Sequence, residues 1–100
     1  MNQQYLITIT VPPALEESVV DWLLAVDSHA GFTSFPVHGH SSLADNLTLA
    51  EQVSGRKQQV RFQIHLPSAG LSQFIDRLRQ DFNGSGLHYW VSPVVESGHI

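Results

Sequence analysis

Hydrophobic residues recur along this chain with a period of two residues, typical of strands, or of three to four residues, typical of helices. The order strand, helix, strand occurs twice. Strand-like segments cover residues 5–11, 32–38, 58–66 and 87–95, with the clearest period-two alternation in the first and third. Apolar residues at three- and four-residue steps, typical of amphipathic helices, cover residues 13–26 and 68–82. The pattern predicts one domain, residues 1–100, with the element order βαββαβ.

Each predicted helix carries one apolar stripe that has to be buried. The two stripes consist of Leu15, Val19, Trp22, Leu23 and Val26, and of Leu71, Phe74, Ile75, Leu78 and Phe82. We therefore interpret Trp22 as a core residue. Two right-handed crossovers place both helices on the same face of a four-stranded antiparallel sheet, which is the α+β ferredoxin-like architecture.

The other face of this sheet is predicted to be bare in a single copy of the chain. In the strand 58–66, Gln59, Arg61, Gln63 and His65 alternate with apolar residues and point away from the helices. An open sheet face and free strand edges favour self-association. We therefore expect a closed homo-oligomer.

Composition and charge exclude several classes of function. Hydrophobic residues make up 42% of the 100 residues and charged residues 14%, as expected for a soluble globular domain. Five basic residues against nine acidic ones give a net charge of −4, so nucleic acid is not an expected partner. The chain has no cysteine, which excludes disulfides, thiolate metal sites and cysteine nucleophiles.

Location and activity are predicted from motifs that the sequence lacks. The sequence has no signal peptide, which would show a basic segment, then an apolar run, then a small-residue cleavage site. No apolar run is long enough to cross a bilayer. We expect a cytoplasmic protein without direct membrane insertion. Neither a nucleophile elbow nor a phosphate-binding loop occurs, so we also expect a protein that is not an enzyme.

Two histidines form the only metal-site candidate that the sequence suggests. His38 and His40 are two residues apart at a predicted strand end, which aims both imidazoles to the same side. Two ligands do not hold zinc or copper alone, and a third would come from Asp45, Glu51 or a neighbouring subunit's histidine. Because the chain has six histidines, a solvated strand end explains this pair better than a divalent metal site does.

The stretch of residues 41–57 is long for a domain whose other connections are short. Such loops usually bind something or are mobile, so function is most readily sought in residues 41–57. Packing of the segment explains its apolar residues better than contact with a partner protein does; they are Leu43, Leu47, Leu49 and Val53. Arg56 and Lys57 lie at its base and could bind an anionic ligand.

Several segments resemble the superfamily of nitrogen regulatory PII and CutA-like proteins. They are GFTSFPVHGH at residues 31–40, RKQQVRFQIHLP at residues 56–67 and YWVSPVVESG at residues 89–98. Within that superfamily, the Gly-Phe-Thr-Ser turn and the Glu-Gln-Val-x-Gly-Arg loop end are similar to those of an uncharacterised bacterial PII-like family, a domain of unknown function. The resemblance implies a homotrimer with its open sheet faces at the centre, ligand sites between subunits and partner contact through the long loop.

The same resemblance directs attention to the turn of residues 83–87. Nucleotide-binding PII proteins place a lysine in this glycine-rich turn and arginines just past the last strand, because phosphates need cationic partners. Here residues 83–87 contain no lysine and residues 94–98 no arginine, so the sequence does not favour adenine nucleotides. Gly84 and Gly86 remain candidate ligand contacts, together with Arg56 and Lys57.

Three hypotheses on function follow. The leading one is a PII-like trimeric regulatory or ligand-sensing protein involved in signal transduction. The alternative is a metal-binding accessory of a heavy-metal efflux system, because genes of the resembled family lie beside such systems. The third is a trimer that mediates protein contacts without any small ligand.

Overall fold

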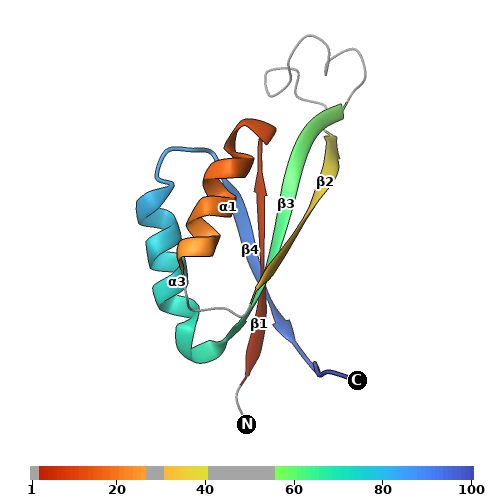
Figure 1. Cartoon of the computed structure of the whole chain (residues 1–100), viewed down its shortest axis with the longest axis vertical. Helices are drawn as coiled ribbons and strands as arrows, with labels where there is room; N and C mark the ends of the chain where they lie inside the picture. Colours follow the sequence, from red (N-terminus) through yellow and green to blue (C-terminus); the bar gives the residue numbers. More distant parts are fainter. Residues whose placement is uncertain (1–2, 27–30, 41–55) are drawn as a thin grey trace.

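The structure, a computed structural model, describes residues 3–26, 31–40 and 56–100. Its elements are β1 (Gln4–Val11), η1 (Pro13–Leu15), α1 (Glu16–Ala25), β2 (Phe32–His40), β3 (Arg56–Pro67), α3 (Ser68–Asp81) and β4 (His88–Val94) (Figure 1). This is the predicted βαββαβ order. The predicted first helix begins with one 3-10 turn, in which the Leu15 amide donates to the Pro12 carbonyl at 3.0 Å.

The four strands form one antiparallel sheet in the order β2-β3-β1-β4. The two inner strands, β1 and β3, carry the most regular alternation. Ile7 of β1 stands opposite Ile64 of β3 on one side and Val91 of β4 on the other. This register puts the apolar residues of neighbouring strands on the same face of the sheet.

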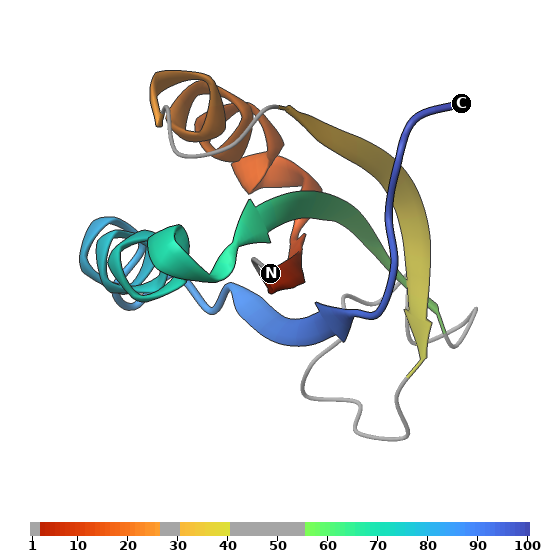
Figure 2. The same cartoon turned by 90° about the horizontal axis from the view of Figure 1, so that it is seen from below.

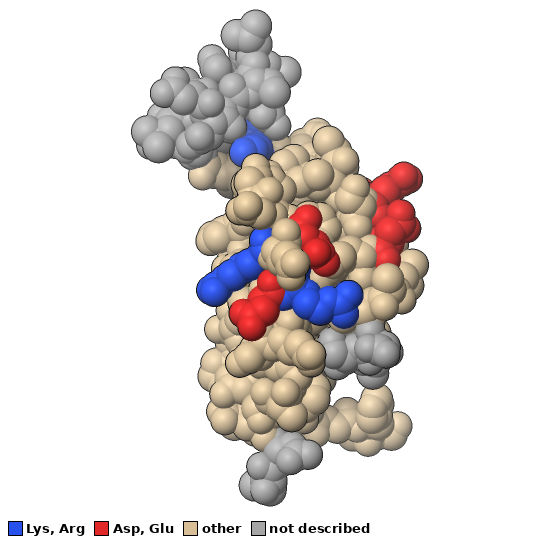
Figure 3. All heavy atoms as spheres, turned by 90° about the vertical axis from the view of Figure 1, so that its left-hand side faces the viewer, with Lys and Arg blue, Asp and Glu red and all other residues tan. Residues whose placement is uncertain are grey.

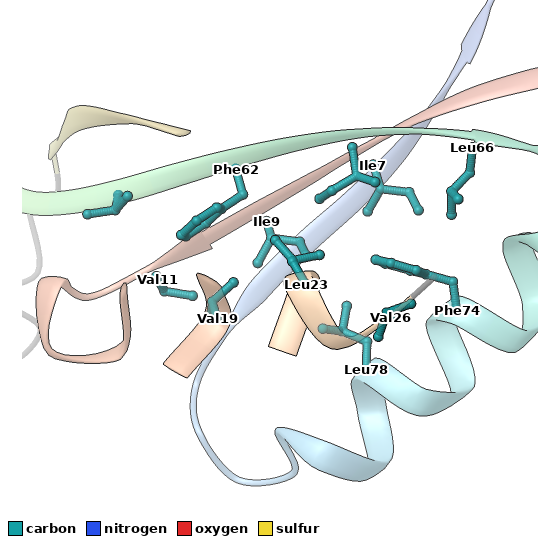
Figure 4. Close-up of a cluster of buried hydrophobic side chains, with 12 residues drawn as sticks. Ile7, Ile9, Val11, Val19, Leu23, Val26, Phe62, Leu66, Phe74 and Leu78 are labelled. Atoms are coloured by element: carbon teal, nitrogen blue, oxygen red, sulfur yellow. The ribbon is translucent and has the colours of Figure 1, made fainter. Parts of the chain in front are cut away.

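Both helices cover that apolar face, which confirms the ferredoxin-like arrangement (Figure 2). The core lies between sheet and helices (Figure 4) and consists of Ile7, Ile9, Val11, Val19, Leu23, Val26, Val60, Phe62, Ile64, Leu66, Phe74 and Leu78. The apolar stripes of the helices and the apolar faces of the strands therefore form one buried layer, and burial of these side chains stabilises the fold.

Trp22 occupies a place that the helical stripe predicted only in part. It is half-buried and packs edge-on against two aromatic rings of the α3 region, with centroid distances of 5.2 Å to Phe74 and 5.7 Å to Phe82. Edge-to-face aromatic pairs stabilise packing beyond the area they bury. Trp22 thus joins the two helices at the rim of the core, and Leu23 beside it fills the centre.

The β2-β3 hairpin is longer than the sequence predicted, which corrects the bounds of the 41–57 loop. Arg56 stands opposite His40, and Lys57 stands opposite Gly39, so both basic residues belong to β3. The backbone ladder continues through these polar positions because it does not depend on side-chain polarity. The remaining segment, residues 41–55, lies outside the described residues.

No helix in the described ranges combines the length and the apolar character that a membrane-spanning helix requires.

Candidate functional site

The glycine-rich turn between α3 and β4 has a backbone that only glycine adopts readily. Gly84 and Gly86 have φ angles of 78° and 79°. Two hydrogen bonds close the turn, from the Ser85 amide to the Phe82 carbonyl at 3.1 Å and from the Leu87 amide to Ser85 Oγ at 3.2 Å. A Cβ at either glycine would meet no atom within 4 Å, so the requirement for glycine is conformational rather than steric.

A pocket of about 310 Å³ lies beside this turn. Its walls come from the last turn of α3, the turn itself and the first residues of β4, and include Leu78, Phe82, Leu87 and both glycines. The sequence predicted the glycines as ligand contacts, but it did not predict the side chains that join them. These are Arg79 and Tyr89.

Arg79 is held at the pocket by a pair of hydrogen bonds. Its Nε and one terminal nitrogen donate to the Tyr89 hydroxyl at 3.1 and 2.6 Å, and its guanidinium carbon lies 5.9 Å from the centroid of that ring. Arginine and tyrosine ten residues apart carry no local signal of such a contact. Only the return of the chain from α3 into β4 brings them together.

The other predicted ligand contacts do not join the glycine turn within one subunit. Arg56 and Lys57 begin β3, whereas the turn precedes β4, and β1 lies between these strands. Successive strand residues point to opposite faces, so Arg56 and Lys57 also point away from each other. Both groups do lie toward the same end of the sheet (Figure 1).

His38 and His40 share a face of β2, as the spacing predicted. They stand opposite Gln58 and Arg56, and both histidines are exposed. Within the described ranges, no group of three His, Cys, Asp or Glu residues is placed to hold a metal ion. Asp45 and Glu51, the third ligands considered from the sequence, lie outside those ranges, so the metal site stays a prediction.

The sheet face opposite the helices is less polar than the sequence predicted. The Arg61 guanidinium reaches across β1, with Nε 3.1 Å from Thr10 Oγ1 and the guanidinium carbon 5.0 Å from the Trp90 ring centroid. The His88 ring packs edge-on against Trp90 at 5.4 Å. Trp90 and Phe35 are each 37% exposed, whereas Thr10 is only 4% exposed beneath this layer.

Thr10, Arg61, His88 and Trp90 contact one another on this face, and we call them the open-face cluster. Cation–π stacking and the hydrogen bond to Thr10 hold the Arg61 guanidinium in place beside Trp90. Sequence alternation over residues 88–92 places Trp90 on the open face, but the stack with Arg61 depends on two strands pairing with β1.

Charges on the opposite side of the molecule are mixed. On the helix side, basic and acidic side chains lie next to one another at the centre of the surface, and a group of acidic side chains lies at one edge (Figure 3). That view of the molecule therefore shows no basic stripe of the kind that binds nucleic acid backbones.

Comparison with known proteins gives a family and a fold. A family model described as "Protein of unknown function (DUF3240)" matches residues 1–100. A search of curated proteins finds no significant match.

Solved structures similar to this chain share its fold at low sequence identity. A DUF3240 family protein from Shewanella baltica superimposes with a TM-score of 0.79 at 19% identity, covering 100% of this chain and 99% of that one. The nitrogen regulatory PII-like protein CPII from Thiomonas intermedia, solved with ADP, AMP and bicarbonate, gives 0.68 at 15% identity over 100% and 98%. The periplasmic divalent cation tolerance protein CutA from Archaeoglobus fulgidus gives 0.68 at 14% identity over 94% and 86%.

Proposed function

Because the chain belongs to the DUF3240 family of proteins of unknown function and has the PII-like fold, we propose that it is a trimeric regulatory protein. In this proposal, a small ligand binds between subunits and a partner protein contacts residues 41–57. The protein acts in the cytoplasm by binding and is not an enzyme.

The observation that carries the trimer is the open-face cluster together with Phe35, which stands opposite Arg61 on the same face of the sheet. A tryptophan, an arginine and a phenylalanine on one sheet face are typical of the buried centres of protein interfaces. Trp90 and Phe35 expose 37% of their surface in the single subunit, and a second copy would cover both. Closed assembly of three copies buries this face in every subunit without leaving an open end.

Assembly would also explain why the predicted ligand contacts are split within one subunit. Arg56 and Lys57 lie on one side of β1 and the Gly84 turn on the other, both toward the same end of the sheet. A neighbouring subunit can bring one group against the other. The ligand-bound PII-like relative, solved with nucleotides and bicarbonate, supports an anionic ligand for this fold.

Partner contact through residues 41–57 is supported by the hairpin that holds this segment. The last pair of the β2-β3 ladder joins His40 to Arg56, so the chain leaves the sheet and re-enters it at neighbouring positions, and Arg56 and Lys57 of the proposed contact lie in β3. A change at a subunit cleft near this end could therefore reach a protein bound to the segment.

Light scattering coupled to size-exclusion chromatography tests the assembly. We expect a species of three times the subunit mass for the wild type and a monomer for Trp90→Glu. Leu24→Glu is the matched control, because Leu24 is 72% exposed on α1 and its substitution adds the same charge away from the sheet. A monomeric wild type, or equal behaviour of the two variants, would refute the proposed interface.

The alternative function, a metal-binding accessory of heavy-metal efflux, is favoured by the shared face of His38 and His40. The CutA similarity supports it through the divalent cation tolerance of that relative. In a trimer, a histidine of a neighbouring subunit would supply a third ligand for zinc or copper.

Calorimetric titration of copper(II), zinc(II) and nickel(II) separates this alternative from the leading proposal. The double variant His38→Ala, His40→Ala should lose metal binding, and His99→Ala is the control for a general loss of imidazole. Equal binding by the double variant and the wild type would remove the metal function.

A further inference from the structure

We propose that the pocket between the end of α3 and the start of β4 binds a small organic monoanion, with Arg79 as the residue that holds its acidic group. The proposed ligand is a carboxylate with an apolar body. All the groups that recognise it come from one subunit.

The orientation of Arg79 is the first argument. Two of its five N–H donors converge on the Tyr89 hydroxyl, which fixes the plane of the guanidinium at the pocket. That partner is a neutral phenol, so the contact does not neutralise the positive charge. A planar guanidinium with donors to spare matches the geometry of a carboxylate.

Arg79 also has an ordinary structural explanation, since a basic residue in the last turn of a helix interacts favourably with the helix dipole. That interaction does not need the side chain to lie over β4. Pairing with Tyr89 instead turns the guanidinium toward the pocket wall.

The pocket's apolar walls and its size restrict the ligand. Leu78, Phe82 and Leu87 line it, so the body of the ligand contacts hydrocarbon. Its volume of about 310 Å³ is at the lower end of the range for small-molecule sites. A molecule the size of a single aromatic ring with one acidic group fits these dimensions.

The charge of the lining limits the ligand to one negative charge. Arg79 is the one basic residue among the residues that line this pocket in the described part of the chain. A polyphosphate would need further cations, and the turn contains no lysine. Gly84 and Gly86 line the same pocket as Arg79, and because they have no side chains they leave room for a carboxylate there.

This inference deepens the proposed function, because it shares Gly84 and Gly86 with the ligand site proposed between subunits. It does not require assembly. A monomeric protein that binds the anion would refute the trimer and keep this pocket, so the two proposals can fail separately.

Titration of the full-length, isotope-labelled protein followed by amide NMR tests the pocket. The probes are benzoate, its neutral analogue benzamide, and inorganic phosphate. We expect saturable shifts of the Gly84, Gly86 and Leu87 amides with benzoate, and binding of benzamide weaker by about tenfold or more, as expected when a charged hydrogen bond is lost. Phosphate should bind more weakly than benzoate because it cannot use the apolar wall.

Two variants and one control test whether Arg79 and Tyr89 are responsible for benzoate binding. Arg79→Gln should weaken benzoate binding by about tenfold, and Tyr89→Phe should weaken it less, because it keeps the ring and frees the guanidinium. Arg77→Gln, on the same helix but outside the lining, should bind as the wild type does. Tyr89→Phe keeps the test valid if Arg79→Gln does not fold.

Equal affinities for benzoate and benzamide would overturn the proposal. Unchanged benzoate binding in Arg79→Gln, shifts confined to amides away from the turn, or no shifts with benzoate would do so as well.

Discussion

The indole nitrogen of Trp22 donates a hydrogen bond of 2.6 Å to Oδ2 of Asp81, across 59 residues of sequence. This contact ties the middle of α1 to the last residue of α3 at the surface of the helix layer. The same tryptophan packs edge-on against Phe74 and Phe82, so one side chain combines a polar and an aromatic link between the helices.

Removal of the polar link should cost a modest amount of stability. Trp22→Phe keeps an aromatic ring and loses the donor, so we expect the free energy of unfolding to fall by about 1 kcal/mol. Asp81→Asn should have a smaller effect in the same direction, because the amide oxygen still accepts the bond. Chemical denaturation measures both, and Asp76→Asn, an exposed acid on the same helix, is the control. A loss in Asp76→Asn as large as in Trp22→Phe would contradict this role.

Substitution in the glycine turn should expose its conformational requirement. Gly84→Ala and Gly86→Ala force an alanine into a positive φ, and we expect each to lower the free energy of unfolding by about 1–2 kcal/mol. Gly98→Ala is the matched control, because its Cβ also meets open space and its φ is not positive. Urea denaturation measures the free energy of unfolding of the three variants. Equal losses in all three would contradict backbone strain at the positive φ angles as the cause.

Gly39 illustrates a different reason for glycine. A Cβ there would lie 2.5 Å from Oε1 of Gln59, whose side chain folds over the glycine on the neighbouring strand. We expect Gly39→Ala to lose less than about 1 kcal/mol, because a flexible side-chain end can move aside. In the Gln59→Ala background the same substitution should cost nothing further. A double-mutant cycle by thermal denaturation checks this, and additive effects would show that the two side chains do not compete for this space.

Adjacent leucines on α1 separate core burial from surface exposure. Leu23 is fully buried and Leu24 is 72% exposed, so truncation of the same side chain should have very different effects. We expect Leu23→Ala to lower the free energy of unfolding by about 2–5 kcal/mol and Leu24→Ala by less than about 1 kcal/mol. Denaturation at equilibrium measures the difference. Similar losses in the two variants would mean that α1 presents another face to the sheet.

Most of the fold could be predicted from the sequence because its signals are local. The alternation of residues 5–11 and 58–66 identified the inner strands, and the stripe through Phe74 and Leu78 identified the helix that covers them. Element bounds were less predictable at the polar end of the hairpin. There Arg56 and Lys57 continue β3 through backbone pairing. Backbone pairing does not require apolar side chains, so the alternation of apolar and polar residues does not reveal it.

The features of the candidate sites also divide into those that local sequence patterns predict and those that depend on the tertiary structure. The glycine turn and the shared face of His38 and His40 follow from short spacings, and the sequence alone determined them. Only the tertiary structure decided that Arg79 meets Tyr89, that Arg61 stacks on Trp90 across β1, and that Trp22 reaches Asp81. Each of these contacts joins side chains from different elements. Their geometry depends on strand register and helix placement, which the whole core sets cooperatively and no local pattern encodes.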